Sequence, residues 1–400
     1  MYRSVSRRGA LRFAALLSLP LFRAFPALAA ALKMELGIGL GNDVAPIVAV
    51  MQRDKLIEKA AEELQFQADF DFLDFSVLLR MLQGLVAGQL DFGTLGSTPT
   101  IRNLALPTAS VPIALAGGGI KFPLQVPPGS PIHNLDDLKG KNVLTIVGSD
   151  LHLVFVLMLA AQFGTADPKA LGITVKNIQA ITELARAEPG IDAVLSVEPE
   201  AQGAVDDGAL VTLLRNDGTT GPAYDGPEGK GEGHVIASFA KTAFAPEAYY
   251  PHRIWWVVRQ EYLQQNPKAV LALLIANARA VKTVAQMTPD AIVEISSKEW
   301  LSDRKAQIPY VENILYRRRG WAWITEGDAR SLVGLSQVKA IFDHPLSGGP
   351  VKDLLRLGAP LAKEAWERVG RDPAPDVFVD AGAKDVRGLP IWEIDRWSTL

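Results

Sequence analysis

The sequence predicts an α/β protein made of two similar units followed by a mainly helical region. Strand-like apolar runs alternate with segments whose apolar residues recur every three or four positions. This alternation occurs over residues 31–121 and again over residues 122–250. Short loops joining strand, helix and strand are typical of a parallel sheet covered on both faces.

The first unit contains three expected strands and two expected helical regions. Its second strand alternates polar and apolar residues, and its second helix stops at Gly88, a residue type that favours helix C-termini. The expected strands are 34–40, 65–72 and 90–93, and the expected helices are 45–51, continued by 54–63, and 76–87.

The second unit repeats this order, and a helical region follows it. The expected strands of the second unit are 122–126, 142–147, 174–178 and 191–197, and its helices are 151–163 and 182–187. A buried strand is expected at 253–258, followed by helices at 266–284, 289–301, 310–319 and 325–342. We expect the tail, residues 371–400, to pack back on the first domain through Val377, Phe378, Ile391 and Trp392.

Residues 1–30 have the features of an export signal. Arg7 and Arg8 lie in a segment that looks like a twin-arginine motif, an apolar run follows, and Ala27-Leu28-Ala29 resembles a signal-peptidase site. The apolar run is shorter than the roughly 20 residues that span a bilayer. We therefore expect a mature, exported chain that begins near Ala30 and is not embedded in a membrane; a retained anchoring helix is the alternative.

Composition excludes several classes of function. The formal net charge is −3, which provides no basic surface for nucleic acid. Cysteine is absent, so disulfides, thiolate metal sites, a cysteine nucleophile and a lipid-modified cysteine are excluded. The five histidines show no metal-ligand spacing, and we expect no metal, no cofactor and no catalytic residue.

Small polar residues follow three of the expected strands. They form the turns Gly41-Asn42-Asp43, Gly96-Ser97-Thr98-Pro99 and Gly148-Ser149-Asp150. Ligands of such sheets bind at the carboxyl ends of the strands, and helix N-termini favour anions. Each turn on its own is equally typical of helix capping. Three at equivalent strand ends favour a ligand site that includes Asn42.

Several segments, taken in order after an export signal, resemble a known family. They are Leu90–Thr100, Asn134–Lys141, Gly148–His152, Ile191–Pro199 and Trp255–Tyr262. Over roughly residues 33–342 the chain resembles the periplasmic substrate-binding proteins of the nitrate, aliphatic sulfonate and taurine ABC transporter family. The resemblance identifies a family and not a ligand.

The resemblance implies a two-lobed type II periplasmic binding fold with a two-crossing hinge. Domain I would comprise residues 31–121 plus 251–400, and domain II residues 122–250. The protein would be a periplasmic monomer that binds a small sulfonate, carboxylate or amine-bearing solute between the domains and delivers it to a membrane permease.

The resemblance also implies which side chains bind the solute. It assigns donor roles to Ser97 and Thr98 in one domain and to Ser149 in the other. Asp150 departs from the family pattern, because a carboxylate replaces a hydroxyl there. Asp150 either caps its helix or faces the ligand, in which case it would repel an anion and suit a cation. His152 either reaches the ligand or packs at the hinge.

A second group of residues departs from the family pattern. Basic His252 and Arg253 stand where taurine-type relatives often have an acidic residue, and Glu198 replaces an aromatic residue. Arg253 either binds an acidic ligand or forms a surface ion pair. Strand alternation lets only one of Trp255 and Trp256 face the ligand, and we favour Trp255.

Two other classes of function remain open. One is an enzyme on the same fold, similar to the aromatic sulfinate desulfinases or the thiamine-pyrimidine synthases, whose chemistry uses a cysteine that this chain lacks. The other is a ligand-sensing partner of a membrane receptor, which would share every residue named above. Only the membrane partner would separate sensing from transport.

Overall fold

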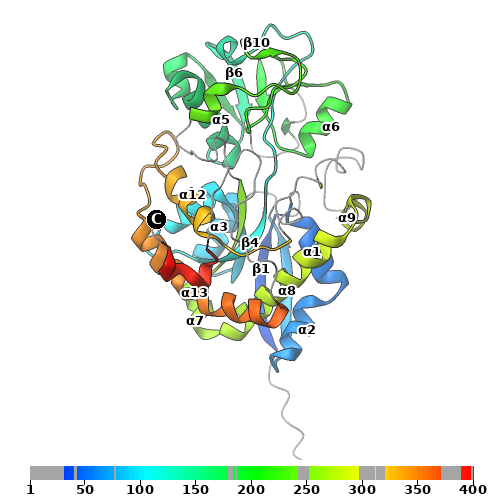
Figure 1. Ribbon diagram of the computed structural model, residues 1–400, viewed down its shortest axis with the longest axis vertical. Coiled ribbons are helices and arrows are strands. Elements are labelled where there is room, and N and C mark those ends of the chain that lie inside the picture. Colours follow the sequence, from blue (N-terminus) through cyan, green and yellow to red (C-terminus); the bar gives the residue numbers. More distant parts are fainter. Residues whose placement is uncertain are drawn as a thin grey trace, which may run out of the picture. The chain divides into compact units, whose positions relative to one another are not determined.

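Two five-stranded mixed sheets organise the described part of the chain (Figure 1). The computed structural model describes residues 31–39, 43–75, 78–178, 183–184, 187–241, 252–296, 311, 320–370, 389–397 and 400. Each sheet is flanked by helices, so the α/β class expected from the sequence is confirmed. Asn42 and the export signal lie outside the described residues.

The first sheet has the strand order β2-β1-β3-β12-β4. Its strands are Ala68–Asp74, Leu32–Ile38, Phe92–Gly96, Arg253–Val258 and Val111–Gly118, in that order. The first three run parallel, but β12 is antiparallel to both β3 and β4. The parallel pairing expected for the three strands of the first unit is therefore confirmed, and β12, which returns from the second sheet, adds an antiparallel strand.

The second sheet has the order β7-β6-β8-β5-β9. Its strands are Thr174–Asn177, Asn142–Thr145, Ala193–Leu195, Leu124–Val126 and Val211–Leu214. Strand β6 is parallel to β7 and β8, whereas β5 is antiparallel to β8 and β9. A small antiparallel hairpin, β10 (Asp225–Gly226) with β11 (Gly229–Lys230), follows.

The helices that were predicted individually begin and end close to the expected positions, except that the one expected at 325–342 ends at Leu335. They are α1 (Ala45–Arg53), α2 (Leu56–Glu63), α3 (Leu78–Val86), α4 (Ser97–Leu104), α5 (Asp150–Phe163), α6 (Glu200–Asp206), α7 (Gln260–Gln265), α8 (Pro267–Gln286), α9 (Pro289–Ser296), α12 (Glu326–Leu335) and α13 (Gly348–Val369). Helices α6, α7 and α13 and strands β4, β9, β10 and β11 were not predicted individually. The expected helices 182–187 and 310–319 fall largely outside the described residues.

Helix α8 is the longest apolar helix of the described chain. Its length and composition would let it cross a membrane, but most of its apolar residues are buried. It packs against α1, α2 and α13, and Figure 1 shows α13 alongside it. Asn277 in this helix accepts a hydrogen bond from the Trp256 indole at 2.9 Å. These contacts identify α8 as a core helix of the first sheet.

Three tryptophans fasten the end of the chain to the first sheet. Trp392 follows the gap at 371–388, and its ring centroid lies 5.6 Å from that of Trp323 and 4.8 Å from that of Trp366 in α13. Ile391 beside it is fully buried. The prediction that the tail packs back is confirmed for Ile391 and Trp392. Val377 and Phe378 lie outside the described residues.

The chain passes between the two sheets at two neighbouring points. It leaves the first sheet after Gly118, at the end of β4, and returns at His252, just before β12. The Gly119 N–H donates to the His252 carbonyl at 3.1 Å, so the two passages are hydrogen-bonded to each other. The predicted domain boundaries lie close to this contact, and they stay predictions.

Candidate functional site

The start of helix α4 is the centre of the candidate site. Gly96 ends β3 and precedes α4, and no side chain of this turn caps the helix. The Ser97 hydroxyl donates to the Arg253 carbonyl at 3.3 Å. The Thr98 N–H donates to Asp150 Oδ1 at 2.6 Å, across 52 residues of sequence. Two of the turns predicted from the sequence therefore meet.

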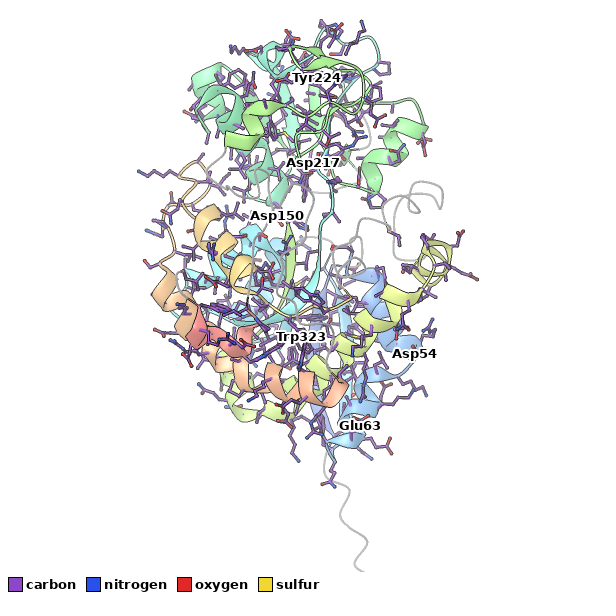
Figure 2. All side chains as sticks on the ribbon, viewed as in Figure 1. Asp54, Glu63, Asp150, Asp217, Tyr224 and Trp323 are labelled. Carbon is purple, nitrogen blue, oxygen red and sulfur yellow. The ribbon has the colours of Figure 1, made fainter. Side chains whose placement is uncertain are left out.

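Asp150 reaches this point from helix α5 of the second sheet (labelled in Figure 2). The sequence left open whether Asp150 merely caps its own helix. Ser149 is the cap: its hydroxyl oxygen accepts from the Leu151 N–H at 3.2 Å and donates to the Ile146 carbonyl at 2.7 Å. The carboxylate of Asp150 is thus directed away from its own backbone and toward α4.

His252 joins the same cluster. Its Nε2 lies 3.5 Å from Asp150 Oδ2, and its ring meets Phe122 edge to face with centroids 5.0 Å apart. His252 and Asp150 are both buried. The cluster therefore combines Thr98, Asp150 and His252, three residues singled out in the sequence.

Asp43 is the member of the cluster that the sequence pattern did not single out. It is fully buried, accepts a hydrogen bond from the Gly118 N–H, and feels the charge of His252. It belongs to the turn Gly41-Asn42-Asp43, from which Asn42 was chosen. Helix and strand patterns do not tell which residue of a turn faces inward, so the turn was the only signal in the sequence.

The pKa values of the two buried carboxylates shift in opposite directions. Burial raises the pKa of Asp43 above its usual value, although His252 and the Gly118 N–H oppose the rise. Burial alone would also raise the pKa of Asp150, but the hydrogen bond and charge of His252, with the Thr98 N–H, bring that pKa below its usual value. Asp150 is therefore held as a carboxylate.

Two glycines make room for these carboxylates. A Cβ placed on Gly96 would overlap Oδ2 of Asp150, and a Cβ on Gly117 would overlap the carboxylate of Asp43. Any other residue at either position would push a carboxylate off the backbone. These positions therefore need glycine for close approach, not for an unusual φ angle.

Arg253 and Trp255 lie beside the cluster in a different environment. Arg253 is buried; its Nε donates to Asp328 Oδ1 at 2.8 Å and its Nη1 to the His252 carbonyl at 2.7 Å. The sequence allowed a surface ion pair here, and the pair is instead in the interior. Trp255 and Trp256 are both fully buried. A ligand contact from Arg253 or Trp255 stays a prediction.

His152 lies two residues after Asp150 in α5 and lines a cavity. That cavity has a volume of about 860 Å³ and is also lined by Val147, Lys169 and Lys339. The imidazole Nδ1 accepts from the Gly148 N–H at 3.3 Å, and burial, with Arg102 nearby, lowers the pKa of His152. The structure therefore does not bring His152 to Asp150.

Two acidic residues follow β8, and the first of them, Glu198, lies beside the first passage of the chain, after Gly118. The Glu198 N–H donates to the Lys121 carbonyl at 3.1 Å, next to Phe122. Burial raises the pKa of Glu198 against the charges of Arg215 and Lys121. Burial raises the pKa of Glu200 to about 8. Glu198 thus adjoins the segment in which Phe122 packs against His252.

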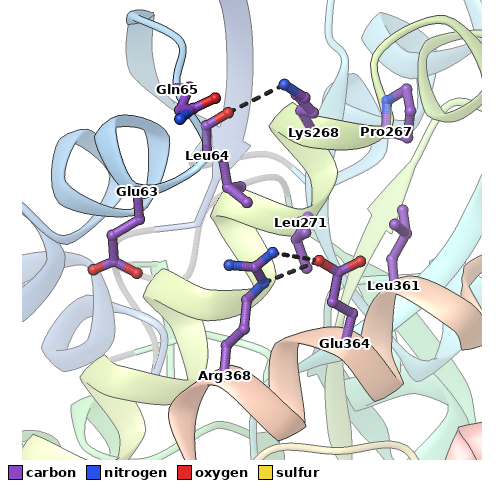
Figure 3. Close-up of a pocket in the computed structure, with 9 residues that line it drawn as sticks. All are labelled: Glu63, Leu64, Gln65, Pro267, Lys268, Leu271, Leu361, Glu364 and Arg368. Atoms are coloured by element: carbon purple, nitrogen blue, oxygen red, sulfur yellow. Dashed lines mark hydrogen bonds and ion pairs between the residues drawn. The ribbon is translucent and has the colours of Figure 1, made fainter.

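A further pocket of about 420 Å³ lies on the first sheet's helices (Figure 3). Lys268 donates to the Leu64 carbonyl at 3.2 Å and Arg368 pairs with Glu364 at 2.7 Å, so both of these cations have partners within the pocket lining. None of the sequence-predicted site residues lines it. Within the described ranges, no group of three or more acidic or histidine side chains could hold a metal ion.

Comparison with solved structures identifies the fold. The alkanesulfonate-binding protein SsuA from Xanthomonas axonopodis pv. citri, solved with MOPS, is 13% identical; the match covers 81% of this chain and 99% of that one, with a TM-score of 0.59. This chain has the periplasmic binding protein fold. The nitrate-binding protein NrtA from Synechocystis PCC 6803 is 15% identical over 85% of this chain and 89% of that one, with a TM-score of 0.58.

The same fold also occurs in an enzyme. The desulfurization enzyme DSZB matches 84% of this chain and 99% of its own at 12% identity, with a TM-score of 0.51. No protein-family model matches the sequence, and no characterised protein matches it at the sequence level. At these identities the periplasmic binding protein fold is established, while the ligand has to be argued from the site.

Proposed function

We propose that the protein is the periplasmic solute-binding component of an ABC importer. The observation that carries the proposal is the meeting of Thr98, Asp150 and His252, which come from three separate segments and from both sheets. All three are among the candidate ligand residues named from the sequence, where helix capping was the alternative for Asp150. Binding proteins for sulfonates and nitrate share the fold, which supports a binding role.

The proposed binding cycle uses the two passages between the sheets as a hinge. Residues 31–121 plus 251–400 form one lobe and residues 122–250 the other. A solute that contacts Thr98 on one side and α5 on the other favours a closed arrangement over an open one. A membrane permease that recognises the closed form then receives the solute from this monomer.

The site residues have defined parts in this proposal. Ser97, Thr98 and Ser149 offer hydroxyl or backbone groups at helix starts, while Asp43, Asp150, Glu198 and His252 set the charge. Asn42 and Trp255 stay predicted contacts. The guanidinium of Arg253 is engaged with Asp328. In this proposal Arg253 therefore influences the solute indirectly, through its charge and through the backbone carbonyls next to it.

A thermal-shift screen of the mature chain tests the proposal. A solute that binds only the folded protein raises its melting temperature, by an amount that corresponds to about 2.7 kcal/mol at a hundredfold excess over Kd. We expect a hit among sulfonates, carboxylates or amine-bearing acids, and we expect His252→Gln to weaken it. The matched control is His133→Gln, an exposed histidine of the second sheet.

The two alternative functions make different predictions in the same experiment. Mass spectrometry of the recovered hit shows an unchanged compound for a binding protein and a product for an enzyme like the desulfurization enzyme that shares the fold. Crosslinking to membrane proteins separates transport from sensing. A permease as the crosslinked partner supports transport, and a receptor indicates sensing. Absence of any hit across the panel contradicts the proposed function.

A further inference from the structure

Helix α4 takes its N-terminal cap from another part of the chain. Its N-cap residue is Gly96, which has no side chain to offer, and no side chain within the turn bonds the first N–H groups. The Thr98 N–H instead donates to the Asp150 carboxylate at 2.6 Å. The start of a helix carries roughly half a positive charge and is a natural position for an anion.

The carboxylate is built into this position. Asp150 is buried, and the Ser149 cap fixes the first turn of α5 behind it. Gly96 lets Oδ2 lie directly against the backbone, where a Cβ would overlap it. His252 Nε2 lies 3.5 Å from the same oxygen. The geometry is that of a bound anion with a donor on each side.

The surroundings are acidic once Asp150 is in place. Asp43 faces His252 from the first sheet, so two buried carboxylates share one imidazole. Arg102 of α4 also lies close by, with its guanidinium against Gly148 at the base of the same turn, and the charge of nearby Arg253 is balanced by Asp328. A further anion would have to enter beside Asp43 and Asp150, in an interior where charges are poorly screened.

We propose that Asp150 serves as an internal anion that fills the α4 anion position and makes the site select cationic, amine-bearing solutes while rejecting sulfonates and nitrate. The inference rests on the proposed function and adds the charge class of the solute. Asp150 is then the residue that determines specificity: it supplies from within the protein the negative charge that an anionic solute would otherwise bring.

Rescue by an added anion tests the internal-anion assignment without requiring any knowledge of the solute. Asp150→Ala empties the position and lowers the melting temperature. Ethanesulfonate then raises the melting temperature of this variant more than sodium chloride at equal ionic strength, whereas it leaves the wild type unchanged. The matched control is Asp207→Ala, which removes an exposed carboxylate from the end of α6. Asp150→Ser is the second variant, for use if Asp150→Ala does not fold.

The outcomes separate this inference from the proposed function. Equal responses of wild type, Asp150→Ala and Asp207→Ala to ethanesulfonate overturn the inference. So does a wild-type protein that binds ethanesulfonate or nitrate as tightly as the Asp150 variants do. Ethylamine and ethanesulfonate differ only in the head group, and we expect Asp150→Ser to shift preference between them at least tenfold toward the sulfonate. Anion rescue in a protein that binds no solute of the panel supports the internal anion and contradicts the importer role.

Discussion

Two adjacent residues, His252 and Arg253, lie in two buried acid–base clusters of opposite character. Arg253 pairs with Asp328 at 2.8 Å, one charge against one, and both side chains are almost completely buried. Asp328 also closes the capping box of α12, where its Oδ2 accepts from the Thr325 N–H at 3.0 Å. This cluster joins β12 of the first sheet to the helix α12.

The His252 cluster is neither balanced nor confined to one sheet. It brings Asp43 from the first sheet and Asp150 from the second to a single imidazole. Burial alone therefore does not distinguish structural charges from a site. An excess of one charge, contributed by segments that meet only in the folded chain, is the feature that points to a binding site.

The largest effect is expected from breaking the Arg253–Asp328 ion pair. Asp328→Asn leaves the Arg253 charge buried without its counter-ion and weakens the α12 cap, and it should lower the free energy of unfolding by about 3–5 kcal/mol. Urea unfolding monitored by circular dichroism measures the loss. The matched control is Asp353→Asn, which removes an exposed pair with Arg356 and should cost less than about 1 kcal/mol. Similar losses in both variants would contradict a structural role for Arg253–Asp328.

A smaller effect is expected from adding a methyl group beside Asp150 in the His252 cluster. Gly96→Ala places a methyl group where Asp150 Oδ2 lies and should cost about 1–3 kcal/mol of unfolding free energy. Because the clash is with one side chain, combining Gly96→Ala with Asp150→Ser should cost less than the sum of the single changes, by about 0.5 kcal/mol or more. Gly349→Ala, at a helical position with open space around it, is the control. Strict additivity would show that Gly96 and Asp150 do not touch.

A third effect, on the pH dependence of stability, is expected at Glu200. The folded state raises its pKa to about 8, so the folded protein holds a proton that the unfolded chain releases. The resulting stability is complete below the ordinary glutamate pKa and is lost as the pH rises through about 8, with a slope of at most about 1.4 kcal/mol per pH unit. Melting curves should show a flatter pH dependence for Glu200→Gln than for the wild type.

The control for this pH dependence is an exposed glutamate of α13. Glu367→Gln changes the same group in solvent and should leave the slope as it is in the wild type. A wild-type stability that is level between about pH 5 and about pH 8 would mean that Glu200 is ionised in the folded protein. The carboxylate excess would then extend further along the second sheet than the His252 cluster.

The sequence predicted the parts of the site that follow from local chemistry. Serine and aspartate after an apolar strand mark a helix start, and this local pattern alone placed Thr98 and Asp150 where a strand ends and a helix begins. The α/β class followed from the alternation of the two periodicities. The docked tail followed from the apolar side chains of Ile391 and Trp392.

The remaining features depend on partners that are distant in sequence. The direction of β12 is set by the chain's return from the second sheet, and the local pattern of a buried strand is the same in either direction. Arg253 finds Asp328 75 residues later, so its pairing has no local signal. The family resemblance left open whether His152 reaches the ligand or packs at the hinge, and in the structure it lines the cavity of about 860 Å³.

The aromatic anchoring of the C-terminal segment has a spectroscopic consequence. All eight tryptophans of the chain lie after residue 250, and among them Trp255 and Trp256 are buried in β12, next to His252. Residues 122–250 contain none. Intrinsic tryptophan fluorescence therefore reports only on the first sheet and its C-terminal helices, and loss of the second sheet by itself would be silent at that wavelength.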